Sequence, residues 1–143
     1  MIDIREINSN NSKSCYELDL QSIKHWNKNQ WKNELEKDDV TAIGIFFNNS
    51  ILGVCILHKV CDEAEIRYLS VHPSYQRRGL GKKLIYNVFK KCKNENVKRI
   101  FLEVSLKNKN ALSFYDYLGF ETISIRKKYY KDGSDALIKE KKC

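Results

Sequence analysis

The segment Ser70–Ile85, SVHPSYQRRGLGKKLI, changes the hydrophobic period of the chain within a few residues. The run that leads into it, Glu65–Val71, is rich in Ile, Tyr, Leu and Val and predicts a strand. From Leu80 onwards, apolar residues recur at every fourth position, which is typical of an amphipathic helix. Gly79 and Gly81 lie where the two patterns meet. Any fold of this chain must therefore lead a strand into a glycine-containing loop and then into a helix.

A junction of this kind can bind an anion. The first N–H groups of a helix lack intrahelical partners, and the helix dipole places partial positive charge there. Glycines let the backbone approach an anion closely, and Arg77, Arg78 and Lys82 add positive charge around the loop. The alternative is an ordinary turn with solvated basic residues, and an isolated G-x-G does not distinguish the two.

Two known nucleotide-binding motifs do not match this junction. A P-loop needs a glycine where Gln76 stands and a Ser or Thr where Lys83 stands. The dinucleotide-binding fingerprint needs a third glycine, and Leu84 occupies that position. The glycines therefore do not indicate a P-loop hydrolase or a dinucleotide-dependent redox enzyme.

The order of the remaining elements predicts a mixed α/β sheet. Strands are expected at Ile2–Ile7, Thr41–Phe47, Ile51–Val60, Glu65–Val71, Arg99–Leu106, Glu121–Lys127 and Ala136–Glu140. Helices are expected at Ser12–Gln21, from Leu80 to Cys92 and at Asn110–Leu118. A further helical stretch, flanked by Trp26 and Trp31, is expected to end near Glu36. Gly119 follows the last of these helices at the position that favours a left-handed residue.

Composition limits the class of protein. A length of 143 residues with 42% hydrophobic residues favours a single domain, 1–143, with its own core. The net charge of +8 favours an anionic partner, although the lysines are spread along the chain rather than gathered in a nucleic-acid-binding tail. The five cysteines show no zinc-site spacing, so we expect reduced thiols and no metal. With no signal-like N-terminus and no membrane-length apolar run, we expect a cytoplasmic protein.

The loop QRRGLG resembles the Q/R-x-x-G-x-G/A motif of the GNAT superfamily of N-acetyltransferases, and LSVHPSY before it resembles that family's strand-to-loop passage. The resemblance implies a central, mostly antiparallel, twisted sheet flanked by helices, with acetyl-CoA as donor. It implies that Leu69, Ser70 and Val71 pair with the pantetheine arm of coenzyme A. The residues implied at the pyrophosphate are Gln76, Arg77, Arg78, Gly79, Leu80, Gly81 and Lys82.

The second half of the chain is similar to one group within this family, the RimI-type enzymes that acetylate protein N-termini such as the N-terminal alanine of a ribosomal protein. The shared pieces are LEV, then an asparagine, then A-x-x-x-Y-x-x-LGF, R-x-x-YY and DA-x-I. The resemblance runs from about Glu65 to Lys139 and is weaker before Thr41. In that weaker part, HWNKNQWKNEL resembles a segment in which Pro-Trp is common, with His25 at the proline position.

The resemblance also implies roles for individual residues. Glu103, in LEV, matches the proposed general base, and Tyr115, in SFYDYLGF, matches the general acid that protonates the leaving thiolate. Asn108 matches an asparagine that contacts coenzyme A, with Asn110 as the neighbouring alternative. Tyr129 and Tyr130 are the candidates for lining the acceptor groove.

From the residues alone, two of these roles would not be assigned. A glutamate that alternates with apolar residues along a strand usually faces solvent, as Glu103 does in its sequence pattern. Tyr115 shares its helix stripe with Ala111 and Leu118, which indicates a core position. Only the order of these residues beside the glycine loop favours catalysis.

The chemistry agrees with an α-amine acceptor. An amine must be neutral to attack a thioester, and a protein α-amine with a pKa of about 7.7–8.0 has a sizeable neutral fraction near neutral pH. Deprotonating a lysine to the same extent costs roughly 3 kcal/mol more. We expect Glu103 to act through water or with a raised pKa, and a strand N–H near Val71 to stabilise the oxyanion.

Three alternatives stay open at this stage. The same fold and donor could serve a small-molecule amine or a lysine side chain. A GNAT fold could bind coenzyme A as a sensor without turnover. From a different class, the chain could be a basic nucleic-acid-binding module, although it carries no helix-turn-helix or aromatic RNA-binding signature.

Overall fold

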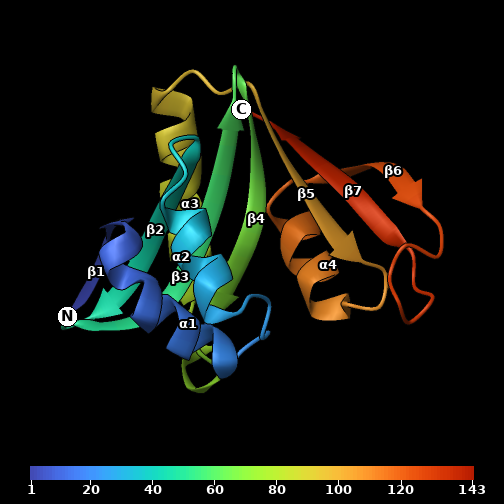
Figure 1. The fold of residues 1–143 in the computed structure, drawn as a ribbon. Coiled ribbons are helices and arrows are strands. Elements are labelled where there is room, and N and C mark those ends of the chain that lie inside the picture. The colour runs from blue at the N-terminus through green and yellow to red at the C-terminus, as the bar shows by residue number, and fades with distance from the viewer.

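The computed structural model describes residues 1–143 and contains one seven-stranded sheet with the strand order β1-β2-β3-β4-β5-β7-β6 (Figure 1). The strands are β1 (Ile2–Ile7), β2 (Val40–Phe47), β3 (Ser50–Val60), β4 (Glu63–Val71), β5 (Arg99–Ser105), β6 (Glu121–Arg126) and β7 (Ala136–Lys142). The helices are α1 (Ser12–Leu20), α2 (Lys28–Leu35), α3 (Leu80–Asn94) and α4 (Lys109–Tyr117). Short 3-10 turns η1 (Ser9–Asn11) and η2 (Pro73–Tyr75) precede α1 and follow β4.

The sheet is antiparallel except at its centre. Strands β1 to β4 pair antiparallel in sequence order, and β7 pairs antiparallel with both β5 and β6. Only β4 and β5 are parallel, and α3 forms the crossover that a parallel pair requires. The mostly antiparallel mixed sheet expected from the sequence is confirmed.

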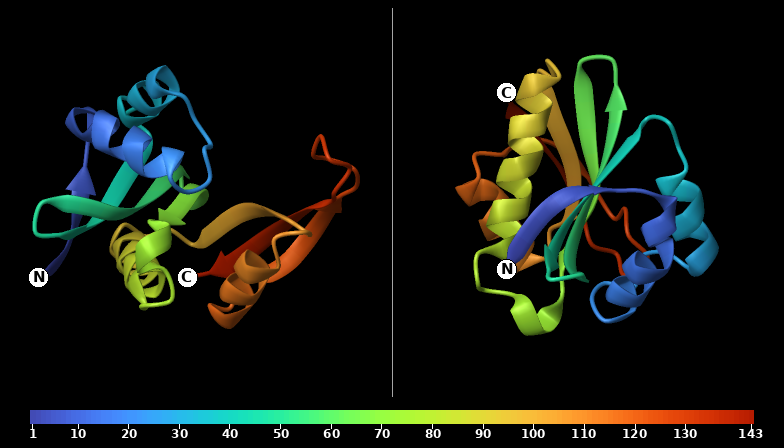
Figure 2. Two further views of the ribbon diagram at one scale, coloured as in Figure 1. Left: turned by 90° about the horizontal axis from the view of Figure 1, so that it is seen from below. Right: turned by 90° about the vertical axis from the view of Figure 1, so that its left-hand side faces the viewer.

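Helices cover both faces of the sheet, as the right-hand view of Figure 2 shows for α3 and the α1–α2 pair. Alternation along the strands separates two cores, because successive side chains point to opposite faces. On β3, Val54 and Ile56 pack with Trp31 beneath α1 and α2. Cys55 and Leu57 pack on the other face, in the core that α3 and α4 share.

The parallel pair β4–β5 separates part of the way along. Its register runs only from Glu63↔Arg99 to Ile66↔Leu102, and the rest of both strands has no partner across this gap. The left-hand view of Figure 2 shows the two halves of the sheet diverging into a V, with the α1–α2 loop and the β6–β7 loop on the same open side. This separation leaves one edge of the end of β4 free inside the molecule.

The sequence-based bounds agree with the structure to within a few residues. The clearest shift is at α2, which begins after Asn27 because the Asn27 side chain and Gln30 form a capping box, so Trp31 lies inside the helix. Strand β7 extends two residues beyond Glu140, to Lys142. No helix in the structure combines the length and the apolar character needed to cross a bilayer.

Candidate active site

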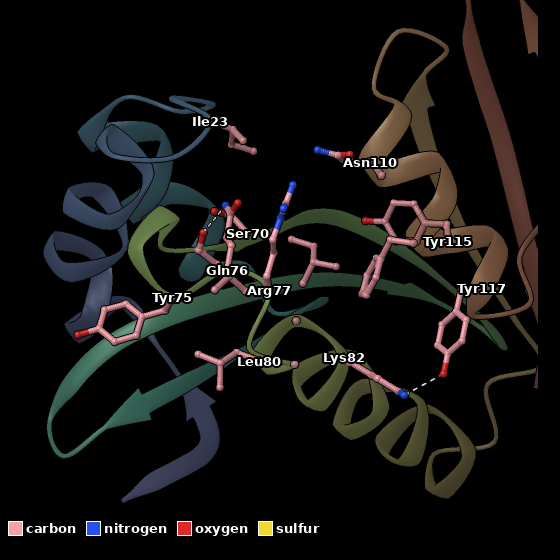
Figure 3. Close-up of a pocket in the computed structure, with 16 residues that line it drawn as sticks. Ile23, Ser70, Tyr75, Gln76, Arg77, Leu80, Lys82, Asn110, Tyr115 and Tyr117 are labelled. Atoms are coloured by element: carbon pink, nitrogen blue, oxygen red, sulfur yellow. Dashed lines mark hydrogen bonds between the residues drawn. The ribbon is translucent and has the colours of Figure 1, made fainter.

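A cleft of about 550 Å³ lies between the end of β4, the start of α3 and the face of α4 (Figure 3). From β4 and the loop after it, the lining residues are Leu69, Ser70, Val71, Tyr75, Gln76, Arg77 and Gly79. From the helices and the α1–α2 loop they are Ile23, Leu80, Gly81, Lys82, Asn110, Ala111, Phe114, Tyr115 and Tyr117. The cleft thus gathers most of the predicted cofactor-binding residues and one of the two predicted catalytic residues.

The glycine loop forms an anion cradle at one end of the cleft. None of the backbone N–H groups from Arg77 to Lys82 has an acceptor within the protein, and α3 starts at Leu80 without a side-chain cap. Arg77 (φ +63°) and Gly79 (φ +79°) adopt left-handed backbone conformations, which turn successive N–H groups into a concavity. A Cβ at Gly79 would meet nothing within 4 Å, so the space above the loop is open to a ligand.

The loop is fastened to β4 and to its own aromatic residue. Gln76 Nε2 donates a hydrogen bond to the Val71 carbonyl oxygen at 3.0 Å. The Arg78 guanidinium lies over the Tyr75 ring, 5.3 Å from its centroid, and Arg78 does not line the cleft. Gln76 therefore holds the loop in place, and Arg78 packs over Tyr75, a lining residue, without lining the cleft itself.

The free edge of β4 directs backbone groups of Leu69 and Val71 toward the cleft, and of these the Val71 carbonyl already accepts a hydrogen bond from Gln76. The His72 N–H donates to the Leu52 carbonyl oxygen on β3 at 2.7 Å. Because backbone groups alternate in direction along a strand, those of Leu69 and Val71 point the other way, toward the gap where β5 has separated. The Ser70 hydroxyl is buried beside the cleft without a hydrogen-bond partner, which leaves an acceptor or donor site for a ligand.

Tyr115 enters the cleft from α4. Its side chain is only 9% exposed, its ring packs against Phe120, and its hydroxyl points into the cleft (Figure 3). Burial, with a smaller contribution from Cys55, raises the pKa of this hydroxyl above its ordinary value. Tyr115 is thus protonated at neutral pH and lines the cleft.

Glu103 lies on β5, outside the lining of the cleft. Its Oε1 accepts a hydrogen bond from the Tyr130 hydroxyl at 3.0 Å, so the predicted base contacts a predicted groove residue. Burial and this bond raise the pKa of Tyr130 above its ordinary value. The exposed Tyr129 packs edge-on against Tyr130, with ring centroids 5.2 Å apart.

The two candidate asparagines differ in position. The Asn108 side chain accepts a hydrogen bond from the Ala111 N–H at 3.2 Å and caps α4, and it does not line the cleft. Asn110 lines the cleft and faces Ile23 across its upper end in Figure 3. The structure thus places Asn108 in a capping role and favours Asn110 for a ligand contact.

Several lining residues were not predicted as site residues. Phe114 and Tyr117 share a helix face with Asn110, so the helical period of α4 carried a signal for them. Tyr117 meets Lys82 across the cleft, where Lys82 Nζ donates to the Tyr117 hydroxyl at 2.9 Å. Ile23 had no local signal, because its place in the cleft depends on how the α1–α2 loop folds back on the sheet.

Comparison with known proteins decides the family. The model of the acetyltransferase (GNAT) family matches residues 4–120, which include β4, the glycine loop and α4. This chain belongs to the GNAT family of acetyltransferases. It is an acyltransferase that uses acetyl-CoA, as the sequence resemblance implied.

Individual GNAT relatives match most of the chain. The [ribosomal protein bS18]-alanine N-acetyltransferase of Haemophilus influenzae is 30% identical over 128 residues, 89% of this chain and 86% of that protein. The crystal structure of the ribosomal-protein-S18-alanine N-acetyltransferase from Escherichia coli is 26% identical, with a TM-score of 0.93 over 99% of this chain and 94% of that chain. A PaiA N-acetyltransferase from Thermoplasma acidophilum, solved in complex with coenzyme A, has the same fold, with 24% identity and a TM-score of 0.85 over 100% and 99% of the two chains.

The residues present fit acetyl-CoA. A diphosphate suits the run of unpaired N–H groups beside Arg77 and Lys82, because such groups bind anions at helix N-termini. An extended amide-bearing chain suits the free edge of β4, since its backbone can pair there as another strand would. The orphaned Ser70 hydroxyl lies next to that edge. Tyr115 lines the same cleft.

Proposed function

We propose that this GNAT enzyme acetylates the N-terminal α-amine of a protein, with the N-terminal alanine of ribosomal protein bS18 as its leading acceptor. The observation that carries the proposal is the extent of the likeness to enzymes of that name. It includes the N-terminal helices, because the E. coli structure superposes on 99% of this chain. The loop between those helices contains Ile23, which lines the cleft, so the likeness includes the side from which an acceptor would enter.

Acetyl-CoA, the acetyl donor, would lie in the cleft with its pantetheine arm along β4 and its pyrophosphate at the glycine loop. Leu69 and Val71 would pair with the pantetheine arm, and the backbone from Arg77 to Lys82 would bind the pyrophosphate. Asn110, rather than Asn108, is proposed as the asparagine that contacts coenzyme A, because the Asn108 side chain already caps α4. Bound acetyl-CoA supplies an activated acetyl group at the end of the cleft near Tyr115.

Glu103 would accept the proton that the amine must lose. It lies outside the cleft lining, so a water molecule is expected to connect it to the amine. The Tyr130 hydroxyl, which donates to Glu103 Oε1, fixes the orientation of the carboxylate. An α-amine with a pKa of about 7.7–8.0 needs only weak assistance, and this favours it over lysine as acceptor.

Two further groups would act on the thioester, one on its carbonyl oxygen and one on its sulfur. The Val71 N–H faces the gap beside β4 and would donate to the oxygen that gains negative charge in the transition state. The Tyr115 hydroxyl would give its proton to the departing sulfur, for which its raised pKa keeps it protonated.

The test is a peptide that offers both kinds of amine. It begins with a free alanine and carries an internal lysine, and it is incubated with the enzyme and acetyl-CoA. Fragment mass spectrometry then locates the added acetyl group. We expect it on the α-amine; acetylation confined to the lysine would contradict the proposal and favour the lysine alternative.

A further inference from the structure

Asp19, on α1, is a carboxylate sealed inside the protein. It is 0% exposed and has no Lys, Arg or His within ion-pair distance. Its oxygens accept hydrogen bonds from the His25 N–H (3.0 and 2.9 Å), the Trp26 N–H (2.9 Å), Trp31 Nε1 (3.0 Å) and the Tyr68 hydroxyl (3.0 Å). Neutral donors alone therefore satisfy this buried charge.

These donors determine the ionisation state of Asp19. Burial favours the neutral acid, but the hydrogen bonds from the Trp26 and His25 N–H groups and from Trp31 and Tyr68 outweigh it, and the pKa of Asp19 lies below its ordinary value. The group is charged at neutral pH. Because a buried charge without such donors is very costly, the donors must stay in place as long as the protein is folded.

The hydrogen-bond donors to Asp19 come from two kinds of segment. Trp31 and Tyr68 belong to α2 and β4, which are fixed by the core. The N–H groups of His25 and Trp26 belong to the α1–α2 loop, which has no regular secondary structure at these residues. The Asp19 carboxylate thus connects the irregular α1–α2 loop to Trp31 on α2 and Tyr68 on β4 through shared hydrogen bonds.

The tied loop forms part of the cleft wall. Ile23, two residues before His25, is 57% exposed yet lines the cleft, where it faces Asn110 across the end remote from the glycine loop (Figure 3). The N–H groups of Ser22 and Lys24, on either side of it, donate to the Asp19 main-chain carbonyl oxygen at 3.1 and 2.9 Å. The next two N–H groups along the loop donate to the Asp19 carboxylate, so both sets of bonds fix the position of Ile23.

We propose that Asp19 is a positioning residue for acceptor binding: its carboxylate holds the α1–α2 loop so that Ile23 forms the acceptor-side wall of the cleft. This rests on the proposed function, in which the acceptor enters at that end. The part of the cleft that would bind acetyl-CoA is built from β4, α3 and α4 and does not depend on the loop. Loss of the hydrogen bonds between the loop and Asp19 should therefore weaken acceptor binding and leave acetyl-CoA binding unchanged.

The central comparison is between Asp19→Ala and Trp31→Phe. Alanine removes both acceptor oxygens of Asp19, so the His25 and Trp26 N–H groups lose their side-chain partner. Trp31→Phe removes one hydrogen bond from the same carboxylate and leaves both loop N–H bonds in place. Both variants should lose thermal stability. Only Asp19→Ala should raise the KM for the acceptor peptide, by roughly tenfold, with the KM for acetyl-CoA within about twofold of wild type.

A third variant keeps the test decisive if Asp19→Ala folds poorly. Ile23 is exposed, so Ile23→Ala should fold normally and should raise the acceptor KM by itself. Combined with Asp19→Ala, it should add little further, because both changes remove the same wall. Equal acceptor KM shifts in Asp19→Ala and Trp31→Phe, or no shift in Ile23→Ala, would overturn the proposal.

Hydrogen exchange separates this proposal from the acceptor assignment. In Asp19→Ala, the amides of His25 and Trp26, which donate to the Asp19 carboxylate, should exchange faster than in Trp31→Phe, whatever acceptor the enzyme uses. Unchanged exchange would overturn the positioning role. A wild-type enzyme that acetylates no α-amine would instead contradict the proposed function, and the exchange result would still decide whether Asp19 holds the loop.

Discussion

The Tyr130 hydroxyl donates a hydrogen bond to Glu103 Oε1 at 3.0 Å, and so joins the β6–β7 loop to the middle of β5. The two residues are far apart in sequence, and each was predicted for a different role, one as base and one as groove residue. Their contact gives Glu103 a fixed orientation that an exposed carboxylate on a strand would otherwise lack. The hydrogen bond therefore connects the proposed base to the loop that is proposed to line the acceptor side.

Tyr130→Phe tests this connection. Loss of the hydroxyl frees the Glu103 carboxylate, so we expect kcat/KM for the acceptor to fall by roughly tenfold with acetyl-CoA binding unchanged. Tyr129→Phe is the matched control, since the Tyr129 hydroxyl makes no hydrogen bond and its ring merely packs on Tyr130. Equal effects of the two variants would show that the loop, rather than the bond to Glu103, matters. In Glu103→Gln, the Tyr130 change should have little further effect.

Tyr115→Phe should lower kcat by about 10² or more, because a positioned general acid contributes about that much. The ring still fills its place against Phe120, so the fold and the affinity for acetyl-CoA should be kept. Calorimetric titration with coenzyme A checks binding separately from turnover. A large loss of affinity with kcat unchanged would mean that Tyr115 is a structural residue.

The pH profile should rise and then stay level. Tyr115 is neutral when protonated, and burial raises its pKa above its ordinary value of 10.0, so it keeps its proton over the whole neutral and mildly alkaline range. The rising limb of kcat/KM should follow deprotonation of the acceptor amine, with an apparent pKa of about 8. Rates measured up to about pH 9.5 provide the check. A falling limb below that pH would argue against Tyr115 as the acid.

Gly81→Glu should abolish acetyl-CoA binding. A Cβ at Gly81 would make only ordinary contacts, the nearest being 3.7 Å to Val71 Cγ2, so the fold should tolerate a side chain there. The carboxylate would, however, stand beside the unpaired N–H groups and repel a pyrophosphate. Lys83→Glu changes the charge of the same helical turn by more but does not line the cleft, and it should bind nearly normally. Near-normal binding by Gly81→Glu would refute the cradle.

Much of the fold could be predicted because its signals are local. The change of period at Leu80, the glycine loop and the turn residues between strands each depend on neighbours in sequence, and the structure has them within a few residues of the expected bounds. The capping box of Asn27 and Gln30 was also a local signal, and it would have corrected the start of α2.

The site was less predictable where it depends on distant contacts. Ile23 reaches the cleft because Asp19 binds both its loop and Tyr68 on β4. The choice between Asn108 and Asn110 required the start of α4, since an asparagine before a helix is as well suited to capping as to ligand binding. Motif order alone places both asparagines beside the cofactor and cannot tell these two uses apart.

The proposed acetylation of an N-terminal α-amine is best measured as turnover of acetyl-CoA with peptides that differ only in their first residue. Release of free thiol is followed for peptides that begin with alanine, with a bulky residue or with a blocked amine, and for a polyamine. If the enzyme acetylates N-terminal α-amines, we expect thiol release with the alanine peptide, less with the bulky residue and none with the blocked amine. Rapid release with the polyamine and none with any free α-amine would contradict it.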